Sequence, residues 1–120
     1  MTVRVLVTGD DGFLGRSLVP ALAMHPGVET VVALDVREVP PQRRMRGVTH
    51  RVQDVRDRQL VQTLRDYAID TVVHLASIVT PGKASDREFE YSVDVGGSLN
   101  VIHACLGAGV FTLLPGRTLG

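Results

Sequence analysis

Three glycines near the N-terminus have the spacing of a phosphate-binding turn. Gly9, Gly12 and Gly15 follow the apolar run of residues 3–8 and precede a stretch with helical periodicity. The first glycine would allow a tight turn out of the strand. The second would let a pyrophosphate approach the backbone, and the third would let the helix pack closely on the strand. Because a helix N-terminus also attracts anions, the pattern predicts a dinucleotide-binding turn.

An acidic residue gives a second signal for the same chemistry. Asp35 closes the next apolar run, about 20 residues past the last glycine, where a carboxylate can accept hydrogen bonds from an adenosine ribose. The same charge repels a 2′-phosphate, so we expect NAD to be preferred over NADP, although Arg37 would soften that preference. No Gly-Lys-Ser/Thr follows the glycines, which excludes a P-loop. Two alternatives stay open: a bare turn with a surface aspartate, and a methyltransferase-like sheet.

The elements that must position these residues alternate between strand and helix. Strands are expected at residues 3–8, 29–34, 47–52 and 71–76, and helices at about 14–22, 60–68 and 86–107. Asp57 is the expected N-cap of the second helix. Residues 36–46 contain prolines and arginines without periodicity, so we expect a loop there. Buried strands separated by helices predict an α/β fold with a parallel sheet.

The last of these helices has two apolar faces. A capping box, Ser85 to Glu88, is expected to open it. One face carries Phe89, Val93, Gly96, Gly97 and Ala104, and the other carries Val95, Leu99, Ile102 and Leu106. Such a helix usually packs on the sheet with one face and on another helix with the other.

Composition and charge narrow the class of protein. The chain has 120 residues, 44% of them hydrophobic, and 13 basic side chains balance 13 acidic ones. This length allows one domain, and zero formal charge gives no electrostatic reason to expect nucleic acid as a partner. No apolar run approaches the roughly 20 residues that span a bilayer. The single Cys105 predicts a reducing, cytoplasmic setting, and the histidines lack the spacing of metal ligands.

Four segments in order resemble one family. Thr8–Gly15 is similar to the cofactor loop of the extended short-chain dehydrogenase/reductases, the NAD-dependent epimerase/dehydratase family. Asp54–Asp57 resembles its acidic turn after the third strand, His74–Ser77 its fourth-strand motif, and Asp94–Val101 its long-helix motif. The resemblance implies an incomplete Rossmann-type, doubly wound parallel sheet of four to five strands with helices on both faces.

The resemblance also implies which residues contact the cofactor. In the family, the first Asp of the acidic turn contacts the adenine, and the fourth-strand motif lines the ribose and nicotinamide side. The expected cofactor-binding residues are Gly9, Gly12, Phe13, Leu14, Gly15, Asp35, Asp54, Val55, Leu75, Ala76 and Ser77. The expected cofactor is NAD, with NADP less favoured.

The sequence departs from the family at its catalytic pair. The family's hydride chemistry uses Tyr-x-x-x-Lys, a spacing that places the phenol and the ammonium group on one helical face. Tyr67 and Tyr91 are followed four residues later by Thr71 and Val95, and Lys83 is the chain's only lysine. No catalytic residue can therefore be assigned. Asp94 also replaces the asparagine usual in the long-helix motif.

These departures set the expected domain organisation and function. Residues 1–110 are expected to be the N-terminal part of an NAD(P)-binding Rossmann domain, and residues 111–120 an aberrant or truncated tail. The resemblance implies an epimerase, dehydratase or dehydrogenase that acts on a sugar-nucleotide-like hydroxyl by hydride transfer. This chain is expected to be inactive in that reaction, and a non-catalytic dinucleotide-binding or sensing module is the alternative. The helix at 86–107 resembles the family's dimer-forming surface, so a homodimer is also expected.

Overall fold

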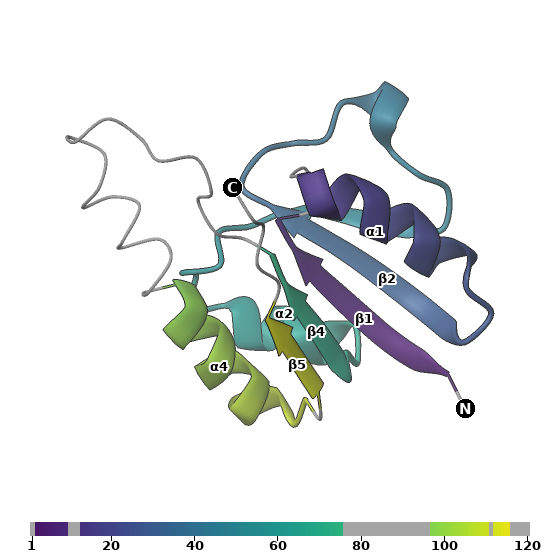
Figure 1. The fold of residues 1–120 in the computed structure, drawn as a ribbon. Helices are drawn as coiled ribbons and strands as arrows, with labels where there is room; N and C mark the ends of the chain where they lie inside the picture. The colour runs from purple at the N-terminus through teal and green to yellow at the C-terminus, as the bar shows by residue number, and fades with distance from the viewer. Residues whose placement is uncertain (1, 10–12, 76–96, 111, 116–120) are drawn as a thin grey trace.

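The computed structural model describes residues 2–9, 13–75, 97–110 and 112–115 (Figure 1). Strands and helices alternate along the described residues, as the sequence predicts. The strands are β1 Val3–Thr8, β2 Val28–Asp35, β3 Val48–Val52, β4 Thr71–His74 and β5 Thr112–Pro115. The helices are α1 Phe13–Met24, the short 3-10 helix η1 Pro41–Arg43, α2 Leu60–Asp66 and α4 Gly97–Ala108.

The described strands form one sheet in the order β3-β2-β1-β4-β5, and every pair is parallel. Thr8 lies opposite Leu34 on one side and His74 on the other. The chain therefore builds outward from β1 in both directions, and the strand order reverses between β1 and β4. In open parallel sheets, such a reversal leaves a crevice outside the carboxyl ends of the strands.

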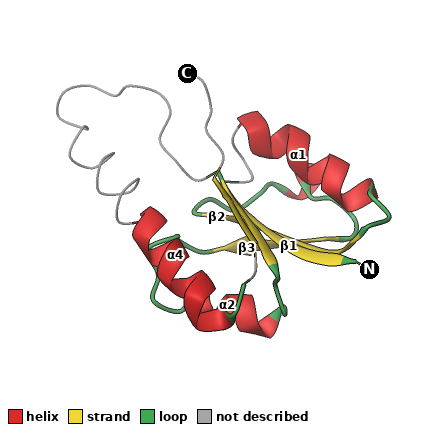
Figure 2. Ribbon diagram, turned by 60° about the horizontal axis from the view of Figure 1, so that its bottom comes forward, coloured by secondary structure: helices red, strands yellow, loops and turns green. Residues whose placement is uncertain are grey.

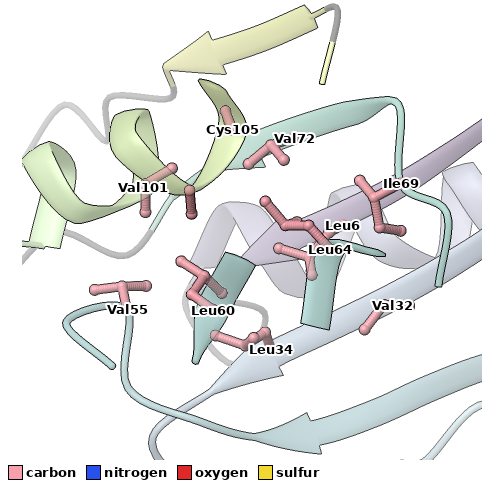
Figure 3. Packing of buried hydrophobic residues seen from close by; sticks show 11 residues of the cluster. Leu6, Val32, Leu34, Val55, Leu60, Leu64, Ile69, Val72, Val101 and Cys105 are labelled. Carbon is pink, nitrogen blue, oxygen red and sulfur yellow. The ribbon is translucent and has the colours of Figure 1, made fainter. Parts of the chain in front are cut away.

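Helices cover both faces of this sheet (Figure 2). On one face α1 buries Val19 over side chains of β1 and β2, including Val5 and Val31. On the other face α2 and α4 lie side by side over the second core cluster (Figure 3). That cluster consists of Leu6, Val32, Leu34, Val55, Leu60, Leu64, Ile69, Val72, Val101, Ala104 and Cys105. Alternate residues of β1 and β2 point into opposite cores, which explains their continuous apolar runs.

The predicted fold class is confirmed: the sheet is parallel, doubly wound and covered on both faces. The strand predictions agree with the structure to within two residues, and β1 has the predicted bounds. The helix α4 matches the C-terminal part of the helix expected at 86–107. Residues 86–96 and the capping box from Ser85 lie outside the described residues.

One local prediction is wrong, because Asp57 is not the N-cap of α2. The helix begins at Leu60, with Gln59 at the N-cap and no side-chain capping bond. Asp57 instead takes part in the turns between β3 and α2. The Asp57 carboxylate accepts a hydrogen bond from the Gln59 N–H at 2.8 Å, and the Asp57 carbonyl accepts one from the Leu60 N–H at 3.1 Å.

Two further segments complete the description. The loop expected at 36–46 contains the single turn η1 and otherwise runs without helix or strand. In the segment expected to be a tail, 111–120, residues Thr112–Pro115 form β5, which pairs in parallel with β4. Phe111 and residues 116–120 lie outside the described residues.

Candidate functional site

The ends of the central strands bring most of the predicted site residues to one edge of the sheet. Thr8, Leu34 and His74 are at the same level in the register, so the residues that follow them, Gly9, Asp35 and Leu75, lie together at the carboxyl edge. Asp54 follows the end of β3 at the same edge. This edge is where the strand order reverses, and it is the candidate site.

Gly9 makes the turn out of β1 that the glycine pattern predicts. Its φ is +73°, in the left-handed region that glycine adopts without steric cost, and its N–H donates to the Leu34 carbonyl at 2.8 Å. Gly15 is buried in the first turns of α1. Gly12 lies outside the described residues, and Phe13 and Leu14 begin α1. Gly9 is thus placed where the turn needs a positive φ, and Gly15 is buried near the start of α1.

A hydrogen-bonded chain of side chains ties β1, β4 and α4 together beside this turn. Thr8 Oγ1 and His74 Nδ1 lie 2.7 Å apart, and His74 Nε2 lies 3.1 Å from Ser98 Oγ. Thr8 Oγ1 also accepts a hydrogen bond from the N–H of Leu75 at 3.0 Å. These bonds fix the ends of the two strands that border the reversal. Leu75 is buried, and Ala76 and Ser77 lie outside the described residues.

Asp35 ends β2 with its side chain half-buried. Its Oδ1 accepts a hydrogen bond from the Arg37 N–H at 3.2 Å. Its carbonyl accepts another from the Gln53 N–H at 2.9 Å, which joins the end of β2 to the residue after β3. The carboxylate therefore lies on a rigid strand end, as ribose recognition would need.

Asp54 is held by the neighbouring arginine. Its Oδ1 accepts from the Arg56 N–H at 2.8 Å and from Nε at 3.1 Å, and its Oδ2 accepts from Nη2 at 2.8 Å. The hydrogen bonds from the Arg56 side chain lower the pKa of Asp54, although partial burial acts in the opposite direction. The carboxylate is therefore ionised at neutral pH and fixed in orientation.

The turn behind Asp54 is packed against α4. Val55 is 3% exposed and belongs to the core cluster under α2 and α4, so its side chain is not available to a ligand. The Asn100 amide donates to the carbonyls of Val55 and Asp57, both at 2.7 Å. Of the two residues of this turn that were predicted to bind the cofactor, Asp54 therefore offers a partly exposed carboxylate and Val55 only its backbone.

The sequence did not predict a pocket beside α1. It has a volume of about 240 Å³ and lies between α1, the connection from β2 to β3, and β3. Val19, Pro20, Val39 and Met45 give it apolar walls, and Gly15, Arg16, Arg43 and His50 complete the lining. The pocket joins segments far apart in the sequence, so composition and spacing give no signal for it.

The chain belongs to the NAD dependent epimerase/dehydratase family, whose pattern it matches over residues 5–118. This confirms the resemblance and NAD as the family's cofactor, and it decides against the methyltransferase alternative. Within the described residues, no three His, Cys, Asp or Glu side chains gather as metal ligands would, and no helix is long and apolar enough to cross a membrane.

Among similar proteins is an uncharacterised epimerase/dehydratase of Staphylococcus epidermidis, 28% identical over 102 residues. The match covers 84% of this chain and 32% of that protein. The chain therefore spans about a third of the length of the curated relatives it matches.

Solved structures share the fold. A Thermus thermophilus UDP-glucose 4-epimerase in complex with NAD is 31% identical, with a TM-score of 0.79 over 92% of this chain and 36% of that one. A GalE-like L-threonine dehydrogenase from Cupriavidus necator, in its holo form, is 23% identical, with a TM-score of 0.80 over 92% of this chain and 35% of that one.

Proposed function

We propose that this chain supplies the adenosine and pyrophosphate half of an NAD site. The observation that carries the proposal is the arrangement of Gly9, Asp35 and Asp54 at one carboxyl edge, at the reversal between β1 and β4. The positive φ of Gly9 suits a backbone that must turn sharply under a diphosphate. Two carboxylates at the same edge of the sheet, Asp35 after Leu34 and Asp54 beyond the end of β3, suit the donors of a ribose and a purine.

Each predicted residue has a role in this proposal. The backbone around Gly9, Gly12 and Gly15 accommodates the pyrophosphate, Asp35 accepts from the ribose hydroxyls, and Asp54 accepts from the adenine. Phe13, Leu14, Val55, Leu75, Ala76 and Ser77 contribute backbone or flanking contacts. The negative charge of Asp35 favours NAD over NADP, because a 2′-phosphate would be repelled.

The family relation supports a substrate class. The similar Thermus thermophilus protein is a UDP-glucose 4-epimerase, which favours a sugar-nucleotide-like hydroxyl as the group that full-length relatives oxidise by hydride transfer. NAD supplies the hydride acceptor in such chemistry. The 120 residues contain no Tyr-x-x-x-Lys to move the hydroxyl proton, so we propose that they bind the cofactor without turning substrate over. The absence of this pair also favours the alternative function, a non-catalytic dinucleotide-binding or sensing module. For either function we propose a cytoplasmic setting.

Calorimetric titration and thermal unfolding with NAD test the proposal. We expect a single NAD to bind and to stabilise the fold, by about 2.7 kcal/mol at a concentration of 100 Kd. Asp35→Asn should weaken NAD binding about tenfold and narrow its margin over NADP, because a charged acceptor is lost. Asp66→Asn, which removes an exposed carboxylate from the last turn of α2, is the matched control.

An unchanged unfolding midpoint at millimolar NAD would contradict the proposal. The same preparation incubated with NAD and UDP-glucose tests for turnover. Neither the 4-epimer of the sugar nor NADH is expected, and the appearance of either would show that the chain is catalytic without the Tyr and Lys pair.

We also propose that two copies of the chain associate through α4. Leu99, Ile102 and Leu106 are 53%, 42% and 78% exposed and lie three or four residues apart, on the face turned away from the core. They match the second apolar face expected from the sequence. A second α4 would cover them, as another helix usually does for such a face.

A further inference from the structure

The turn that carries Asp54 is hydrogen-bonded to a residue distant in the sequence. Asn100, in α4, donates both N–H groups of its side-chain amide, one to the Val55 carbonyl and one to the Asp57 carbonyl, each at 2.7 Å. These carbonyls lie on either side of Arg56. The contact spans more than 40 residues of sequence and is partly buried, so it connects the turn to the helix rather than to its own strand.

A second contact brings the same helix close to the same turn. Gly97 is buried at the start of α4, and a Cβ built on it would lie 2.6 Å from Val55 Cγ2. Any larger residue would push the helix away from Val55. Gly97 and Asn100 lie three residues apart and therefore on one side of α4. That side of α4 contacts the turn through the Val55 side chain and through the carbonyls of Val55 and Asp57.

The carboxylate of Asp54 has few hydrogen-bond acceptor positions left for a ligand. The Asp57 N–H closes the turn by donating to the Asp54 carbonyl at 2.9 Å. Among the described residues, the carboxylate accepts two hydrogen bonds at Oδ1 and one at Oδ2, all from Arg56. A carboxylate offers about four acceptor positions, so one remains, at Oδ2. A ligand group that meets it must be a hydrogen-bond donor.

We propose that Asn100 is a positioning residue for purine selectivity: through the Asp54 turn, it holds the remaining acceptor position where the 6-amino group of adenine can donate to it. The inference rests on the proposed NAD site and adds to it the group that is recognised and the residue that fixes its partner. Without the amide, the Val55 carbonyl loses this donor, the Asp57 carbonyl keeps only the Leu60 N–H, and the turn is free to change its angle to α4. Adenine would then lose its affinity margin over a purine that has no donor at that position.

Nicotinamide purine dinucleotide is the probe, because a hydrogen replaces the 6-amino group of adenine and the rest of the molecule, including the acceptor N1, is unchanged. Calorimetry on the full chain gives the ratio of its Kd to the Kd of NAD. We expect a ratio of about tenfold or more for the unaltered protein, the contribution of one hydrogen bond to a charged acceptor. The ratio should fall below about threefold in Asn100→Ala and to about one in Asp54→Ala. In the double variant the ratio should fall no further than in Asp54→Ala alone.

Gln62→Ala is the matched control. It removes a side-chain amide that donates to Asp66 on the same helix, α2, and it should leave the ratio unchanged. If Asn100→Ala does not fold, Asn100→Thr keeps one hydroxyl donor and serves the same comparison.

The outcomes separate this inference from the proposed function. A purely structural role for Asn100 would weaken both dinucleotides by the same factor, leave the ratio intact and overturn the inference. Equal binding of both dinucleotides to the unaltered chain would also overturn it, while the NAD site stood. Failure of the unaltered chain to bind either one would overturn the proposed function and the inference together.

Discussion

At the scale of single residues, the site combines local and distant contacts. The pairing of Arg56 with Asp54 is local, since the two lie two residues apart, and it could have been read from the sequence. The glycine at position 9 was also predictable, because only a turn residue with positive φ fits between β1 and α1. The burial of Val55 was not, because its partner Gly97 is more than 40 positions away.

The ion pair of Asp54 and Arg56 predicts a specific dependence of stability on pH. The pKa of Asp54 is lower in the folded chain than the ordinary value of 3.8, mainly because the Arg56 side chain donates hydrogen bonds to it. The contribution of the pair is therefore complete above that ordinary value and is lost as the pH falls through the lower folded pKa. Urea unfolding should show Asp54→Asn slightly less stable than the unaltered chain at pH 7, with the gap closing below about pH 4.

The effect should be small, because both side chains are more than a third exposed and solvent screens the pair. In an Arg56→Ala background, Asp54→Asn should show no gap that depends on pH in this way. A gap that persists at low pH in both backgrounds would attribute the effect to the backbone of the turn instead.

At the scale of elements, periodicity predicted what each segment is, and local hydrogen bonds decided how α2 is capped. The helix expected at 60–68 does begin at Leu60, but Asp57, which has the side chain of a cap, uses it within the preceding turn. The sequence also predicted two faces on α4, and the structure buries Val101, Ala104 and Cys105 on one while leaving Leu99, Ile102 and Leu106 exposed.

The close approach of α4 to the Asp54 turn predicts the effect of one methyl group. Gly97→Ala should destabilise the chain by about 1–3 kcal/mol, because the new Cβ would overlap the Val55 side chain. Val55→Ala should remove most of that cost in the double variant, as a thermodynamic cycle of urea unfolding would measure.

Gly107→Ala is the control within the same helix. Its Cβ would lie 3.1 Å from Val61 Cγ2, a contact that needs a smaller adjustment, so it should cost less than Gly97→Ala. Equal costs for the two substitutions, with no rescue by Val55→Ala, would show that helix packing on the turn is not close in solution.

At the scale of the whole molecule, the predicted order of strands and helices was enough to fix the two-sided sheet, since right-handed crossovers leave few arrangements. The order of elements did not predict the pocket beside α1 or the hydrogen-bonded link from Thr8 through His74 to Ser98. Both depend on side chains from three separate elements meeting in space.

Association through α4 gives a prediction at this scale. Ile102→Glu should shift sedimentation from dimer to monomer, because a charge in an apolar helix contact is costly to bury. Val52→Glu places the same charge on β3, where the side chain is 57% exposed, and should leave the dimer intact. A monomer at all concentrations of the unaltered chain would rule out this interface.

The position of β1 has a consequence for biosynthesis. Among the described strands it is made first, yet it is the central one, and its contacts with Asp70 and His74 join residues 66 apart in the sequence. Until β4 is made, the nascent chain carries a β1 that can pair only with β2. Such distant pairing slows folding, and an unpaired apolar strand invites association with other chains. Chaperone capture of nascent chains should therefore peak before residue 74 emerges and decline after it.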